Sequence, residues 1–143
     1  MSATKILKLM KEKEVDYVDL RFTDPRGKLQ HLTMDGKIVD EEMLNKGVYF
    51  DGSSIAGWKA INESDMILKP DLERQVIDPF TSHNTLVLFC DVLDAVKKDP
   101  YERDPRSTAK KAEVYLKKSG IGDKAYFGPE AEFFVFDDVR YKN

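Results

Sequence analysis

Two glutamates, two positions apart, have the types and spacing to do chemistry. Glu130 and Glu132 lie in the run FGPEAEFFVF, residues 127–136, which otherwise reads as a strand bound for a protein interior. Because a strand alternates its side chains between faces, both carboxylates share a face with Phe134 and Phe136. An ionised carboxylate there is costly unless cations or hydrogen-bond donors meet it. The spacing indicates either a cation-binding pair or a solvated strand end, and alone it does not choose.

A second polar group lies in VYFDGSSIAGW, residues 48–58, a Gly- and Ser-rich loop between apolar flanks. Asp51 offers a carboxylate, and Ser53 and Ser54 offer hydroxyls close to it. The same residues are also ordinary turn formers, because Asp-Gly is a common turn dipeptide and serine hydroxyls satisfy loop backbone. Trp58, the only tryptophan, is more often a packed core anchor than a binding platform. Both interpretations stay open for this loop.

The short motifs of common catalytic sites are absent from the sequence. It contains no phosphate-binding G-x-x-x-x-G-K-[ST], no dinucleotide-binding G-x-G-x-x-G, no zinc-binding H-E-x-x-H and no nucleophile motif G-x-S-x-G. His31 and His83 are far apart in the chain, so we expect surface or hydrogen-bonded histidines rather than ligands. The single Cys90 lies in an apolar run, which indicates a packed thiol in a reducing, cytoplasmic compartment.

Composition sets the broad class of protein. The 143 residues, 41% of them hydrophobic, suffice for one ordinary domain or for one small domain with part of a second. There are 23 basic and 26 acidic residues and no basic block, so nucleic acid is not expected as a partner. The N-terminus has no long apolar run for a signal peptide or membrane span, so we expect a soluble protein with no membrane partner.

The pattern of apolar residues predicts a small α+β domain. Two helices are expected, at residues 4–13 and 40–46, the second stopped by Gly47. Residues 15–24 and 28–35 alternate and are joined by the turn DPRG, which predicts a hairpin. Further strands are expected at 64–73 and 84–94, the latter apolar enough to be central in the sheet.

A linker is expected at residues 96–106, VKKDPYERDPR, because it has two prolines and alternating charges. After it, the segment 104–122 predicts a helix with Gly120 past its end, and residues 125–137 predict a strand. One helix and one strand cannot bury a core alone. We therefore expect 104–143 to be the incomplete beginning of a second domain.

Taken together and in order, five segments resemble bacterial type I glutamine synthetase. They are VDLRFTDPRGKLQH, FDGSSIAGW, SDMILKPD, DPRSTAKKAE and FGPEAEFFVFD. The resemblance extends over essentially the whole chain. It implies an α+β fold in which residues 1–103 form an N-terminal β-grasp-like domain, a mixed sheet with short helices. Residues 104–143 would then be the first helix and strand of a truncated α/β catalytic domain.

The resemblance also implies an activity. The family ligates ammonia to the γ-carboxylate of glutamate with ATP as a substrate, through γ-glutamyl phosphate. Asp51 matches the family's catalytic, ammonium-binding aspartate, and Ser54 matches a residue lining the ammonium pocket. Glu132 matches a ligand of the cation beside glutamate, and Glu130 a ligand of the cation on the ATP phosphates. Two ions per site are implied, Mg²⁺ or Mn²⁺.

In the family, sites form between adjacent subunits of a homo-oligomer, a stacked double ring. Trp58 and Asp65 would lie near such a shared site. Most other ligands in the family come from later segments, so we expect the 143 residues alone to be inactive. Two alternatives remain: a related γ-glutamyl-amine ligase, and a non-catalytic β-grasp interaction module. An acidic, ammonium-sized pocket argues against the first, and paired strand carboxylates argue against the second.

Overall fold

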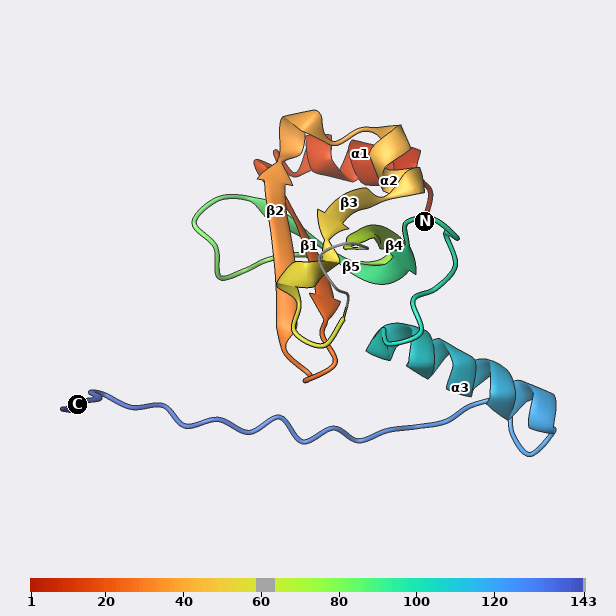
Figure 1. Ribbon diagram of the computed structural model, residues 1–143. Coiled ribbons are helices and arrows are strands. Elements are labelled where there is room, and N and C mark those ends of the chain that lie inside the picture. The colour runs from red at the N-terminus through yellow and green to blue at the C-terminus, as the bar shows by residue number, and fades with distance from the viewer. Residues whose placement is uncertain (59–63, 143) are drawn as a thin grey trace.

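The computed structural model describes residues 1–58 and 64–142. Five strands form one mixed sheet in the order β2-β1-β5-β4-β3 (Figure 1). The parallel pair β1–β5 lies inside it, and the other neighbouring strands run antiparallel. The expected mixed α+β sheet is therefore confirmed. The strands are β1 (Tyr17–Thr23), β2 (Leu29–Asp35), β3 (Val48–Asp51), β4 (Asp65–Ile77) and β5 (Thr85–Asp94).

In the part of the chain that the structure describes, three α-helices and two short 3-10 helices accompany the sheet. The α-helices α1 and α2 contact each other on one side of the sheet, whereas α3 lies apart from them (Figure 1). Each α-helix begins at a side-chain cap, which accepts a hydrogen bond from a backbone N–H of the first turn. The helices are α1 (Ala3–Glu12), η1 (Gly36–Ile38), α2 (Glu41–Lys46), η2 (Gly52–Ser54) and α3 (Pro105–Ser119).

The hairpin β1–β2 forms as the alternation predicts. Its turn is held by Asp24, whose Oδ1 accepts hydrogen bonds from the backbone N–H groups of Arg26 and Lys28, both at 2.9 Å. Gly27 takes a φ of +83°, a conformation that residues with a Cβ rarely adopt. These local interactions fix the register of β1 against β2.

The core lies between α1, α2 and one face of the sheet. Ile6 of α1 and Leu44 of α2 are buried against strand residues that include Leu20, Leu86 and Leu88. The prediction that residues 84–94 form a central strand is confirmed, because β5 is third of five. Within residues 1–58 and 64–142, no helix has both the length and the apolar character to cross a membrane.

Residues 48–51 and 125–137 differ in secondary structure from the sequence-based expectation. Residues 48–51, expected as loop, form β3 and pair with the first residues of β4. The strand expected at 125–137 is wrong for this structure: the segment is extended but pairs with no strand of the described residues (Figure 1). A strand needs a neighbour to satisfy its backbone groups, and none is at hand here. Phe133 and Phe134 are consequently more than 80% exposed.

Candidate active site

Asp51 ends β3 and caps the single turn η2. Its Oδ1 accepts hydrogen bonds from the backbone N–H of Ser53 at 2.8 Å and from Ser53 Oγ at 2.6 Å. These two bonds, with a smaller contribution from Ser64, hold the pKa of the exposed Asp51 carboxyl below its ordinary value. The carboxylate is therefore kept ionised, as a site for a cation requires.

Close packing against β4 explains why a glycine, Gly52, follows Asp51. Its backbone N–H donates to the carbonyl oxygen of Ser64 at 2.7 Å, which ties the turn to the start of β4. A Cβ at this position would lie 2.7 Å from Met66 Cγ and 2.9 Å from the Ser64 oxygen. A larger residue would push the turn off β4. Close packing, and not a left-handed backbone conformation, requires glycine here.

Asp65 is the cross-strand partner of Asp51. The antiparallel register pairs the two residues directly, so both side chains lie on the same face of the β3–β4 pair. Both are exposed, and Ser54 is exposed one turn further on. The structure thus places Asp51, expected at an ammonium site, opposite Asp65, expected near a shared site. Ser54, also expected at the ammonium site, follows Asp51 by three residues. Two adjacent carboxylates make this edge of the sheet attractive to a small cation.

Trp58 lies in the core and not at the surface. It is 5% exposed and contacts three aromatic rings, with centroid distances of 5.6 Å to Phe22, 6.1 Å to Phe50 and 5.6 Å to Tyr101. This supports the interpretation of Trp58 as a packed anchor. Buried Gly52, Ile55 and Trp58 recur every three residues, which leaves Asp51 and Ser54 on the outer side of the loop.

Glu130 and Glu132 lie in the extended segment that follows α3 and do not join the sheet (Figure 1). Both are exposed. In residues 1–58 and 64–142, no hydrogen bond or ion pair holds either carboxylate, and no group of three or more His, Cys, Asp or Glu side chains could hold a metal. The structure does not bring the two glutamates to Asp51. Their oxygens are the donors that Mg²⁺ and Mn²⁺ prefer, so the donor chemistry fits although the site needs further ligands.

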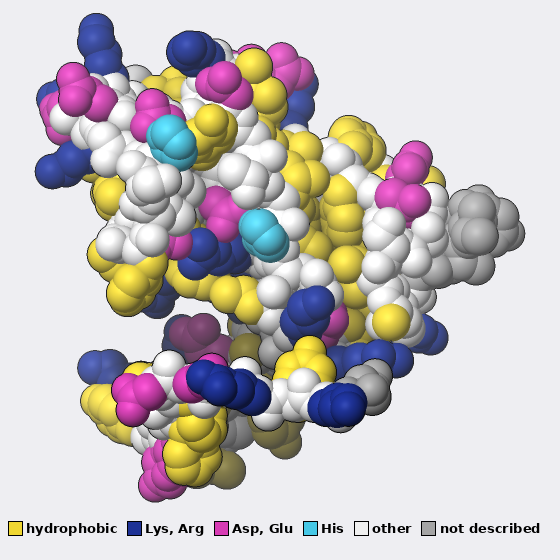
Figure 2. All heavy atoms as spheres, turned by 90° about the vertical axis from the view of Figure 1, so that its left-hand side faces the viewer, with side chains coloured by type: hydrophobic (Ala, Val, Ile, Leu, Met, Phe, Trp, Pro, Cys, Tyr) yellow, Lys and Arg dark blue, Asp and Glu magenta, His cyan; other side chains and the backbone are white. Residues whose placement is uncertain are grey.

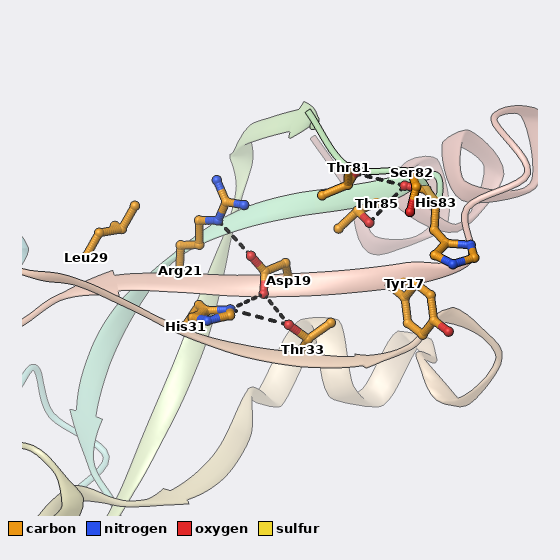
Figure 3. Close-up of a pocket in the computed structure, with 10 residues that line it drawn as sticks. All are labelled: Tyr17, Asp19, Arg21, Leu29, His31, Thr33, Thr81, Ser82, His83 and Thr85. Carbon is orange, nitrogen blue, oxygen red and sulfur yellow. Dashed lines mark hydrogen bonds and ion pairs between the residues drawn. The ribbon is translucent and has the colours of Figure 1, made fainter. Parts of the chain in front are cut away.

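A cavity of about 530 Å³ on the sheet was not foreseen from the sequence (Figure 3). It brings His31 and His83 to one face, although they are far apart in the chain (Figure 2). His31 Nδ1 lies 2.8 Å from Asp19 Oδ1, and His83 Nδ1 lies 3.8 Å from Asp16 Oδ2. Both histidine side chains are largely exposed and each lies near a carboxylate, which agrees with the expectation of surface or hydrogen-bonded histidines. The lining residues are Tyr17, Asp19, Arg21, Leu29, His31, Thr33, Thr81, Ser82, His83 and Thr85.

Asp19 is the buried centre of this cavity, with 4% of its surface exposed. Burial by itself would raise the pKa of Asp19, but hydrogen bonds from Thr33, His31 and Arg21 hold the pKa below its ordinary value. Arg21 donates to Asp19 at 2.7 Å and to Asp78 at 2.6 Å. The hairpin register pairs Asp19 with Thr33 and Arg21 with His31. The predicted hairpin is the sequence signal that could have indicated this network, because its register pairs these residues across the two strands.

Cys90 is buried in the centre of β5, with 1% of its surface exposed. Burial raises the pKa of its thiol well above the ordinary value. A thiol that stays protonated is a poor nucleophile. The expectation of a packed, unreactive cysteine is confirmed.

The fold defines a class of protein: a β-grasp domain, in which helices pack on a curled mixed sheet, followed by the start of a further domain. Two family models match the chain, "Glutamine synthetase, beta-Grasp domain" over residues 14–95 and "Glutamine synthetase, catalytic domain" over residues 102–143. The chain belongs to the glutamine synthetase family. The resemblance seen in the five sequence segments is thereby confirmed.

Relatives in bacteria are similar over nearly the whole chain. The glutamine synthetase of Rhizobium meliloti (strain 1021) is 65% identical over 141 residues, and that of Azorhizobium caulinodans is 59% identical over 141 residues. The enzyme of Cereibacter sphaeroides is 62% identical over 135 residues. These matches cover 94–99% of this chain. The chain spans about 30% of the length of these relatives.

Solved structures have the same fold. A Plasmodium falciparum glutamine synthetase matches with a TM-score of 0.78 and 25% identity, over 87% of this chain and 24% of that one. GmaS without ligand matches with a TM-score of 0.73 and 20% identity, over 81% of this chain and 27% of that one. The match to GmaS shows the fold alone.

Proposed function

We propose that the full-length enzyme carrying this chain is a glutamate–ammonia ligase, which uses ATP to form glutamine through γ-glutamyl phosphate. The observation that carries the proposal is the exposed pair Asp51 and Asp65 at the end of β3–β4, with Ser54 beside it. Family membership supports the same activity. The rest of the proposed site comes from outside these 143 residues.

In this proposal Asp51 attracts ammonium and directs its N–H bonds. The hydrogen bonds from Ser53 stabilise the charged carboxylate, so they favour holding a cation. Such a carboxylate is a weak base, but it can accept one proton from ammonium, which frees the nitrogen lone pair to attack the γ-carbonyl carbon. The bond from that carbon to the phosphate oxygen then breaks, and the leaving phosphate takes the second proton from nitrogen. Asp65 adds negative charge, and the Ser54 hydroxyl lines the pocket. Trp58 holds the loop from within the core.

Glu130 and Glu132 are proposed ligands of two divalent cations, Mg²⁺ or Mn²⁺. Glu130 would serve the cation shared with ATP, and Glu132 the cation beside glutamate. Such cations neutralise the charge of a transferring phosphoryl group when bound. Strand residues two apart have Cα atoms separated by roughly 6.6 Å, so the two carboxylates can serve neighbouring ions. The extended segment that holds them would gain its strand partners in the full-length enzyme.

We further propose that the enzyme is a cytoplasmic homo-oligomer, a stacked double ring with sites shared between adjacent subunits. The edge of the sheet at β3 exposes Asp51, Ser54 and Asp65, which leaves them accessible to another copy of the chain. The division at residues 103 and 104 belongs to the same proposal, with the β-grasp domain before it and the catalytic domain after it.

Amine selectivity tests the function. We expect the full-length enzyme to release ADP in the presence of glutamate and ammonium, with kcat/KM for methylamine at least about 100-fold lower, because the added methyl group needs room beside two carboxylates. Equal or better use of methylamine would favour a γ-glutamyl-amine ligase. No ADP release with any amine would favour a non-catalytic interaction module.

A further inference from the structure

The segment between β5 and α3 is a structured joint and not a free linker. The backbone N–H of Tyr101 donates to the Val92 carbonyl oxygen at 2.8 Å. Asp104 is fully buried, and its Oδ2 accepts from the backbone N–H and the hydroxyl of Ser107 at 2.9 and 2.6 Å. The Asp104 bonds cap the start of α3, and the Tyr101 bond, with the Val92 N–H that donates to Asp104 Oδ2 at 3.5 Å, holds the segment against the central strand.

The same joint contacts the loop that follows Asp51. Tyr101 Oη donates to the Trp58 carbonyl oxygen at 3.1 Å, and its ring packs edge-on against the Trp58 indole. Arg103 Nη1 donates to the Gly57 carbonyl oxygen at 2.8 Å and lies 3.5 Å from that of Trp58. Two consecutive carbonyl groups of the loop are therefore held by two side chains from the joint.

The loop depends on such outside contacts because its own bonds are few. Between Gly52 and Trp58, the described backbone bonds within the loop run from Ile55 N–H to Gly52 and from Trp58 N–H to Ile55. Gly57 adopts a φ of +86°, a conformation that residues with a Cβ rarely take. Its carbonyl orientation is then set by Arg103. A shift there would carry along the few intervening residues to Ser54 and Asp51.

We propose that Tyr101 and Arg103 are positioning residues for the ammonium site, acting through the carbonyl groups of Gly57 and Trp58. The inference rests on the proposed function. It connects the point where the chain leaves the β-grasp sheet to the geometry of the Asp51 loop. Neither side chain touches the substrate in this assignment, so their loss changes where Asp51 lies and not which groups react.

The test compares KM values in the full-length enzyme. Tyr101→Phe keeps the ring but removes the hydroxyl, and Arg103→Gln removes the guanidinium. Each should raise KM for ammonium about three- to ten-fold, the effect of losing one hydrogen bond, with KM for ATP and glutamate within about two-fold of the parent. Arg103→Lys, which keeps one donor, should recover part of the loss. The controls Tyr17→Phe and Arg26→Gln make the same chemical changes on the distant hairpin and should leave all three constants unchanged.

Trp58 emission gives a second readout. We measure this emission in the 143-residue chain, whose single tryptophan is Trp58. The emission maximum should move to longer wavelength in Tyr101→Phe and Arg103→Gln, because the loop around Trp58 loosens. A parallel rise of all three KM values, or no rise for ammonium, would overturn the inference. The variant Asp51→Asn separates a failure of the positioning role from a failure of the proposed function. If it raises KM for ammonium while the joint variants do not, only the positioning role fails. If Asp51→Asn has no effect, the proposed function fails and takes the inference with it.

Discussion

Asp51 and Asp65 face each other as a directly opposed pair at the end of the antiparallel strands β3 and β4. Like charges in this position destabilise a sheet. Ser53 nevertheless stabilises the ionised form of Asp51 with two hydrogen bonds. A small cation bound beside both carboxylates would offset their repulsion, and ammonium at the proposed site is such a cation.

Replacing Asp65 tests this relationship in the 143-residue chain. Asp65→Asn removes one of two facing charges at constant size, so we expect the thermal midpoint to rise by about 1–2 °C. In the full-length enzyme the same change should raise KM for ammonium. The control Asp99→Asn removes an exposed charge that lies outside the sheet. Equal midpoints for both variants would show that the two carboxylates do not interact.

Ser53 sets the titration of Asp51. The hydrogen bonds lower the pKa of Asp51, so the carboxylate stays charged further into acid than an ordinary aspartate does. Ser53→Ala removes the hydroxyl donor, and the pKa should therefore move upward. The ¹³C shift of the Asp51 carboxyl carbon, followed against pH in the 143-residue chain, measures this directly. A titration curve identical to that of the parent would contradict the assignment.

Glu130 and Glu132 should differ in which ligand they affect. In the full-length enzyme, Glu130→Gln should weaken metal-dependent binding of ATP, whereas Glu132→Gln should weaken metal-dependent binding of glutamate. An amide keeps the shape but loses the charge, so raising the Mg²⁺ concentration should partly restore each variant by mass action. Titrations with each substrate at several metal concentrations provide the comparison. If both variants bind like the parent, the glutamates are only a solvated strand end.

Asp19 should make stability depend on pH. Its pKa is lowered in the folded chain, so its contribution is present above the unfolded value of about 3.9 and is lost as the pH falls through the folded value. Asp19→Asn removes the negative charge beside Arg21 and His31 and replaces one of the two acceptor oxygens with an NH2 donor. We expect the free energy of unfolding in urea at pH 7 to fall by about 1.5–3 kcal/mol. The loss should shrink below pH 4, and a constant difference from pH 7 to pH 3 would contradict this.

Much of the fold could be predicted because its signals are local. The hairpin has strict alternation and the turn that begins at Asp24, and β5 has the uninterrupted apolar run of a central strand. By contrast, β3 has four residues, and only its pairing with β4 identifies it. The strand expected at 125–137 has the right residues, but strand formation also requires a neighbour that the described residues do not provide.

The candidate site also has a part that could be predicted from the sequence and a part that could not. Asp51, Ser54 and Asp65 were expected near one another from a family resemblance, and the β3–β4 register supplies the geometry that the sequence could not. The cavity with both histidines was missed because it depends on long-range strand order. The contacts of Tyr101 and Arg103 were also missed, since charges and prolines made their segment resemble a linker.

Ammonium kinetics of Asp51→Asn in the full-length enzyme test the central claim most directly. The substitution removes the charge and the proton acceptor at nearly constant size, and a positioned acid–base group is typically worth about 10²–10⁴-fold. We expect kcat/KM for ammonium to fall by about that factor, with KM for ATP little changed and the Asp99→Asn control like the parent. If kcat and KM for ammonium were both unchanged in Asp51→Asn, the assignment of this loop to the ammonium site would be wrong.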